Sequence, residues 1–160
     1  KKVDYLKGIY ERMHRSIEAH PVEMNADTLG LLDGITFAFL SMDAGEKKRA
    51  VVAKLEALGV AFIDVGMGLE LTNGSLGGIL RVTTSTPTKR EHVHQGRISF
   101  AGGGQDVYAS NIQVADLNAL NACLAVVKWK KIRGFYRDLE CEHHCTYTTD
   151  GNMLINGDLA

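Results

Sequence analysis

One carboxylate and several lysines form the set of residues in this sequence that could act on phosphate groups. Asp43 follows an apolar run of strand length, residues 35–42, and Lys47 and Lys48 come shortly after it. A carboxylate at the end of a strand can hold Mg²⁺ through one or two oxygens, while water and phosphate supply the other ligands. Lysines nearby, including Lys2 at the start of a helical pattern, would stabilise a polyphosphate. The alternative interpretation is that Asp43 caps a helix and the lysines are ordinary surface residues.

The residues around Asp43 predict a strand, a helix and a second strand. Residues 35–42 are almost all apolar, as in a parallel strand covered on both faces. Residues 46–58 have helical periodicity, with Gly59 at their end, and residues 60–65 are rich in β-branched side chains. Ligands of open α/β sheets bind at the carboxyl ends of strands, which is where Asp43 is expected to lie.

The rest of the chain predicts shorter elements around this unit. An amphipathic helix is expected over residues 2–20, and a brief one over 28–32. Residues 79–85 predict a strand that pairs back on the preceding one, and residues 146–149 and 152–155 predict a hairpin. The longest helix is expected over 112–133, with its apolar part buried against the sheet or against a partner. Residues 86–111 are polar and glycine-rich, which is typical of a long crossover loop or lid.

Three motifs could indicate a metal site, a reactive cysteine or a nucleotide-binding loop, but each has a simpler structural interpretation. Residues 141–145, CEHHC, lack the second, separated ligand pair of a structural zinc site, and we interpret them as a partly buried helix end. Cys123 lies within an apolar helical pattern and is interpreted as a core residue. Residues 66–68, GMG, lack the third glycine and the following helix of a dinucleotide-binding loop.

The composition limits the classes of protein and partner. The 160 residues are enough for one domain, and a net charge of −1 gives no indication of a nucleic-acid or anionic-membrane partner. Three cysteines indicate a reducing compartment, so we expect a cytoplasmic protein. No apolar run has the length of a membrane span, and no signal peptide is recognised. Because the sequence opens in a helical pattern without a methionine, we expect it to be a fragment.

Three stretches resemble one enzyme family. They are KV at residues 2–3 opening a helix, FAFLSMDAGEKKRAVVAKLEALGVAFIDVGMGLEL at 37–71, and IQVADLNALNACLAVVKWKKIRGFY at 112–136. Together they resemble the ThiF-type adenylyltransferases, the ubiquitin-activating-like enzymes that include MoeB and HesA relatives, and in particular their bacterial branch. The resemblance covers almost the whole chain.

The resemblance implies an α/β, Rossmann-like three-layer fold with a mostly parallel central sheet, here truncated at its N-terminal side, so that residues 1–160 form a single partial domain. It implies a dimeric, cytoplasmic transferase that uses ATP and Mg²⁺ to adenylate the C-terminal carboxylate of a small ubiquitin-like or sulfur-carrier protein. By this resemblance Asp43 holds Mg²⁺, Lys2 lies near the nucleotide phosphates, and Lys48 takes the place of a family arginine.

The sequence also departs from the family pattern. Ala44 stands where the family usually has asparagine. Lys48 stands where the family has arginine, but Arg49 is only one position further, so either residue could be the basic partner. The glycine-rich nucleotide loop is missing, so the fragment by itself is expected to be inactive. Residues 86–111 hold no transfer cysteine, and no paired zinc motifs occur, so neither a thioester step nor structural zinc is expected. The alternatives are a non-catalytic, degenerate ThiF-like interaction or dimerisation module, and an unrelated doubly wound nucleotide-binding protein.

Overall fold

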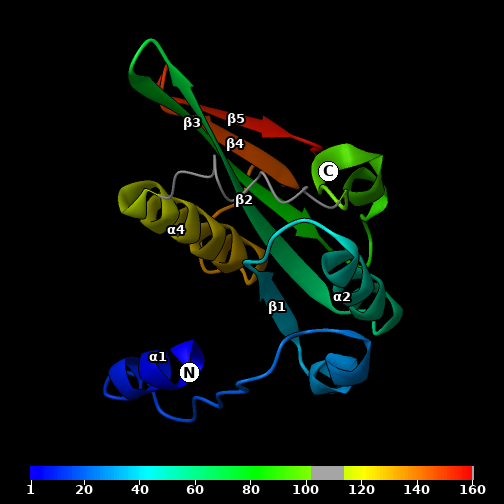
Figure 1. The fold of residues 1–160 in the computed structure, drawn as a ribbon. Helices are drawn as coiled ribbons and strands as arrows, with labels where there is room; N and C mark the ends of the chain where they lie inside the picture. The colour runs from blue at the N-terminus through cyan, green and yellow to red at the C-terminus, as the bar shows by residue number, and fades with distance from the viewer. Residues whose placement is uncertain (102–113, 160) are drawn as a thin grey trace.

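The computed structural model describes residues 1–101 and 114–159. Five strands and five helical segments follow one another along this part of the chain (Figure 1). The helical segments are α1 (Lys2–Tyr10), η1 (Ala26–Leu32), α2 (Glu46–Ala57), η2 (Val93–Arg97) and α4 (Ala115–Ile132). The strands are β1 (Phe37–Leu40), β2 (Ala61–Thr72), β3 (Ser75–Ser85), β4 (His144–Thr148) and β5 (Met153–Gly157).

The strands form one mixed sheet in the order β1-β2-β3-β4-β5. Only β1 and β2 are parallel, and the other three neighbouring pairs are antiparallel. The protein is therefore of mixed α/β class, and the expected predominance of parallel strands is not confirmed in the described residues. A short connection explains the β2–β3 pair: these strands are joined through Asn73 and Gly74, both with positive φ, and such a tight turn can only link antiparallel strands.

The central strand–helix–strand unit agrees with the sequence prediction. β1 and β2 pair in parallel, with α2 between them along the chain. Gly59, at φ +69°, follows the end of α2 in the left-handed conformation that glycine adopts readily. β2 continues well past Val65, where the sequence predicted its end, and pairs with β3 along its whole length.

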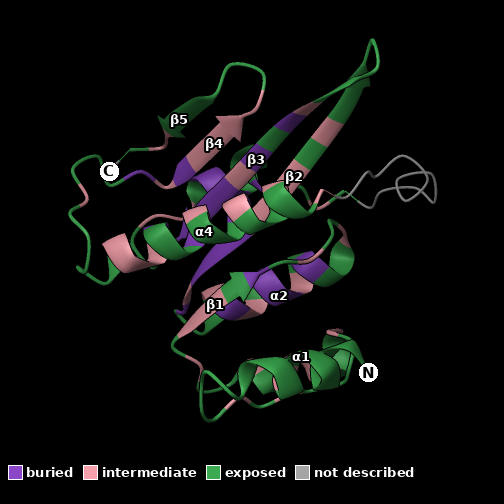
Figure 2. Ribbon diagram, turned by 90° about the vertical axis from the view of Figure 1, so that its left-hand side faces the viewer, coloured by how far each residue is buried: buried purple, intermediate pink, exposed green. Residues whose placement is uncertain are grey.

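Helices α2 and α4 cover opposite faces of this sheet, and the division falls between two consecutive residues of β2. Phe62 belongs to a buried cluster with the apolar face of α2, whereas Ile63 packs with Ala125 of α4. Neighbouring side chains of a strand point to opposite faces, so the two clusters lie on either side of the sheet. Figure 2 shows the buried residues concentrated in β2, β3 and the inner face of α2.

The first helix is much shorter than predicted. α1 ends at Tyr10, although the sequence predicted a helix to residue 20. No residue of α1 is buried, and the helix lies apart from the sheet in Figures 1 and 2. A helix without tertiary packing gains little stability from its sequence alone, which explains the early end.

The longest helix is present, and the sheet buries only part of its apolar stretch. α4 has only Asn121, Ala125 and Lys128 buried, while Val126 and Val127 are exposed. The predicted loop over residues 86–111 is described up to residue 101, where η2 forms and contributes Val93 to the buried cluster beneath α2. The remainder of that loop lies outside the described residues. No helix in the described part of the chain is long and apolar enough to cross a membrane.

Candidate functional site

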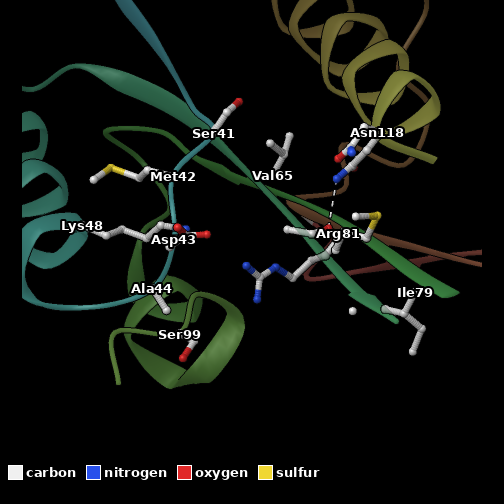
Figure 3. Close-up of a pocket in the computed structure, with 14 residues that line it drawn as sticks. Ser41, Met42, Asp43, Ala44, Lys48, Val65, Ile79, Arg81, Ser99 and Asn118 are labelled. Carbon is white, nitrogen blue, oxygen red and sulfur yellow. Dashed lines mark hydrogen bonds between the residues drawn. The ribbon is translucent and has the colours of Figure 1, made fainter. Parts of the chain in front are cut away.

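A cavity of about 530 Å³ opens beside β2, just beyond the end of β1. β1 stops at Leu40, whose partner in β2 is Asp64, so from Val65 onward that edge of β2 has no β1 residue beside it. The cavity has the size of a small-molecule binding site. Its wall comes from the loop after β1, the first turn of α2, β2, β3, the segment after η2, and α4 (Figure 3). The lining residues are Ser41, Met42, Asp43, Ala44, Lys48, Val65, Gly66, Met67, Gly68, Ile79, Arg81, Ser99, Asn118 and Asn121.

Asp43 lies in the loop that leads from β1 into α2, and it is exposed at the cavity wall. The N-cap of α2 is Gly45, with φ +135°, which has no side chain to accept a hydrogen bond from the helix. Asp43 is therefore not the N-cap residue of this helix, as the alternative interpretation had it. The glycine conformation lets the chain turn sharply into α2, which brings the first turn of that helix to the cavity.

The buried carboxylate of Asp64 pairs with both cations of the cavity wall. The sequence did not point to this residue. Asp64 is fully buried in β2 and accepts a hydrogen bond from Lys48 Nζ at 2.7 Å and one from Arg81 Nη2 at 3.0 Å. Burial raises the pKa of Asp64 above its usual value, and the two cations partly oppose this shift. The group of two cations and one carboxylate leaves one positive charge when all three are ionised.

A glycine in β2 makes room for the arginine. Gly66 stands opposite Arg81 in the β2–β3 register. A Cβ atom at Gly66 would lie 2.5 Å from Arg81 Nη2, so any larger residue would displace the guanidinium. This explains the first glycine of the GMG motif: it lies within a strand and lets Arg81 cross its backbone to reach Asp64.

Two buried polar atoms in the cavity wall have no hydrogen-bond partner among the residues that the structure describes. Asn121 is only 5% exposed; its Nδ2 donates to the carbonyl of Gly66 at 3.0 Å, but its Oδ1 is buried without a donor. Arg81 Nε is likewise buried without an acceptor. Buried polar atoms are usually satisfied, and leaving one unpaired costs about 1–3 kcal/mol. Both atoms are enclosed, so a shift of the Arg81 or Asn121 side chain would be needed before a bound molecule could satisfy them.

The structure brings together two of the three predicted site residues. Asp43 and Lys48 both line the cavity. Lys2 lies on the exposed helix α1 and is not among the lining residues. Arg49, the other candidate for the basic partner, points elsewhere: it pairs with Glu46 at 3.2 Å and lies over the ring of Phe100.

The sequence suggested that residues 141–145, which hold two cysteines and two histidines, form a helix end. The structure does not place a helix there. β4 begins at His144, whose Nδ1 lies 3.0 Å from the hydroxyl of Thr83 in the neighbouring strand β3. Burial lowers the pKa of His144 to about 4, so this imidazole is neutral at pH 7. Within residues 1–101 and 114–159, no three His, Cys, Asp or Glu side chains are grouped closely enough to hold a metal ion. Cys123, predicted to be a core residue, is exposed.

The site can hold a charged ligand on chemical grounds. Asp43 supplies the type of oxygen that Mg²⁺ prefers, and a single carboxylate leaves room for the water and phosphate ligands that this ion keeps. Arg81 and Lys48 provide nearby positive charge.

Neither the protein-family models nor the curated proteins with which the sequence was compared contain a match to this chain.

Proposed function

We propose that this cavity binds ATP with Mg²⁺, and that the chain is part of a ThiF-type adenylyltransferase acting on the C-terminal carboxylate of a small ubiquitin-like or sulfur-carrier protein. The observation that supports the proposal is the convergence of Asp43, Lys48 and Arg81 on one cavity at the carboxyl end of a parallel strand. This is the edge of an α/β sheet where nucleotides bind. The resemblance of residues 37–71 and 112–136 to that family supplies the type of reaction.

In the proposed reaction, a carboxylate oxygen of the protein substrate attacks the α-phosphorus of ATP. The new P–O bond forms as the bond to the β-phosphate oxygen breaks, giving an acyl adenylate and pyrophosphate. Asp43 would hold Mg²⁺, which would neutralise charge on the phosphates. Catalysis of this kind depends on positioning and on charge stabilisation, which the cationic residues of the cavity wall would provide.

The remaining parts of the family interpretation are proposals of the same kind. A mostly parallel, Rossmann-like sheet would require further strands beside β1, which is an edge strand of the described sheet. A glycine-rich phosphate loop would have to come from residues outside 1–160. Cytoplasmic location and a homodimer also belong to the proposal.

A second candidate function is a non-catalytic module that binds a partner protein or a second copy. It is favoured by apolar side chains at the surface near β1. Phe39 is 47% exposed on this edge strand, close to the ring of Trp129 on α4. Large exposed apolar side chains on a sheet edge are a common feature of interaction surfaces.

ATP–pyrophosphate exchange by the full-length protein separates the two functions. Asp43→Asn removes the proposed metal ligand while keeping the size of the side chain, and Asp27→Asn, at an exposed position in η1, is the matched control. We expect exchange to fall at least about 100-fold in Asp43→Asn and to stay within about twofold of wild type in Asp27→Asn. Exchange that survives Asp43→Asn unchanged would refute the metal-holding role, and absence of exchange in the wild type would favour the interaction module.

A further inference from the structure

We infer that Arg81, which the sequence analysis did not select, is the cation that contacts the phosphate chain of the bound nucleotide, and that Asp64 is the residue that positions it. The inference rests on the proposed function, because it assigns a role within the same cavity. It also changes the role of Lys48, which becomes part of the support behind the site.

Lys48 is too enclosed to meet a ligand. Its side chain is 3% exposed, and its ammonium group lies 2.7 Å from Asp64 Oδ1. Moving Lys48 toward the cavity would leave the fully buried Asp64 with one counter-ion fewer. An ammonium ion held in this way neutralises a buried carboxylate, and separating such a pair is expensive.

Arg81 has the access to the cavity that Lys48 lacks. Its side chain is 24% exposed, and Figure 3 shows its guanidinium directed from β3 into the cavity, toward Asp43 and Ala44. Nη2 is paired with Asp64, while the buried Nε has no acceptor. A guanidinium has five N–H groups arranged in a plane, so one edge can bind a carboxylate while another binds a phosphate oxygen.

Asp64 and Gly66 fix the direction of this side chain. Asp64 lies two residues before Gly66 on β2, and Gly66 stands opposite Arg81. The arginine therefore lies flat over the glycine, with one end anchored by the carboxylate. Holding a flexible arginine in place before the ligand arrives reduces the entropy that binding must overcome. Asp64 makes no contact with the ligand in this account and acts only through Arg81.

The test measures how strongly binding depends on the phosphate chain. The full-length protein is titrated with MgATP, AMP and magnesium pyrophosphate, using wild type, Arg81→Gln and Arg81→Lys. Arg49→Gln is the matched control, because Arg49 is a basic residue outside the cavity wall. Circular dichroism verifies that each variant is folded, and Arg81→Lys keeps the test valid if Arg81→Gln does not fold.

We expect Arg81→Gln to weaken MgATP and pyrophosphate binding at least about tenfold while AMP binding changes less than about twofold. Arg81→Lys should lie between wild type and Arg81→Gln, because it keeps the charge and loses the planar, two-sided geometry. Arg49→Gln should bind all three probes as wild type does.

Three other outcomes each contradict a defined part of the account. If MgATP binds and Arg81→Gln either leaves it unchanged or weakens AMP to the same degree, the phosphate role of Arg81 is wrong and the proposed function stands. In another outcome, the wild type binds pyrophosphate through Arg81, does not bind AMP, and binds MgATP no more tightly than pyrophosphate. The cavity then binds anions as inferred, but the adenylyltransferase proposal is wrong. If none of the three probes binds, both are wrong.

Discussion

Replacing Lys48 by methionine tests whether the buried charge group supports the fold of the site. Methionine keeps the length and apolar stem of lysine but leaves Asp64 with Arg81 as its only counter-ion within residues 1–101 and 114–159. Removing one partner from a buried ion pair costs about 3–5 kcal/mol. Since Arg81 stays within 3.0 Å of Asp64, we expect the lower end, a loss of about 3 kcal/mol in the free energy of unfolding.

The neighbouring residue provides a matched control. Lys47, one position earlier in α2, has a side chain that is more than half exposed and pairs with Glu23 at the surface. Exposed pairs contribute little, so Lys47→Met should change stability by less than about 0.5 kcal/mol. Urea unfolding followed by circular dichroism at pH 8 measures both variants. A loss in Lys48→Met no larger than in Lys47→Met would refute the structural role of the buried charge group.

The pH dependence of the Lys48→Met stability loss tests whether the buried carboxylate of Asp64 causes that loss. The folded-state pKa of Asp64 is raised by burial, and losing Lys48 raises it further. A carboxyl group of this kind stabilises the folded state while it is protonated, and that stability is lost as the pH rises through its folded-state pKa. The cost of Lys48→Met should therefore be smaller at pH 5 than at pH 8. The double variant Lys48→Met/Asp64→Asn should recover part of the loss, and no recovery would contradict this explanation.

Two further predictions follow from the glycine beside Arg81 and from the buried histidine. Gly66→Ala should reduce stability by about 1–3 kcal/mol, because the new Cβ would lie 2.5 Å from Arg81 Nη2, whereas Gly68→Ala has open space and should be within about 0.5 kcal/mol of wild type by urea unfolding. Since burial lowers the pKa of His144 to about 4, this group should make the folded state lose stability as the pH falls from about 6.5 toward 4, by up to about 1.4 kcal/mol per pH unit. His144→Gln should make the slope shallower, although His143, whose pKa is also lowered, still contributes, and the exposed His14→Gln should leave the slope as in wild type.

The local elements of the fold could be predicted because their signals lie close together in the sequence. The apolar run ending near Met42, the helical periodicity after Gly45 and the glycine at 59 were enough to predict β1, α2 and the start of β2. The strand that pairs back on β2 was predicted over residues 79–85, and it begins earlier, at Ser75; the hairpin of β4 and β5 was predicted from turn residues between alternating segments. Tight turns account for two of the three antiparallel pairs, β2–β3 and β4–β5.

The errors arose where tertiary packing decides the outcome. The periodicity of residues 2–20 suggested a long helix, but no core surface lies against α1 to stabilise it. Residues 141–145 were interpreted as a helix end, yet β4 begins at His144 because that strand pairs with β3. Cys123 was assigned to the core from an apolar pattern, but this side of α4 is exposed.

The candidate site was predicted only in part for a related reason. Asp43 and Lys48 were found from their position after a strand, but Asp64 and Arg81 were missed. A single acidic residue in the apolar run of residues 60–65 was the available signal, because a buried carboxylate requires a partner. Which cations would reach Asp64 could not be read from the sequence, since that depends on the β2–β3 register and on the absence of a side chain at Gly66.

The central claim is that this cavity holds a metal-bound nucleotide between Asp43 and Arg81. The most direct test is a crystal structure of the full-length protein with ATP and Mn²⁺, in which the anomalous signal locates the metal. The account predicts a Mn²⁺ peak within bonding distance of the Asp43 carboxylate and phosphate oxygens against the Arg81 guanidinium. A nucleotide bound elsewhere, or a cavity that stays empty at saturating MnATP, would contradict it.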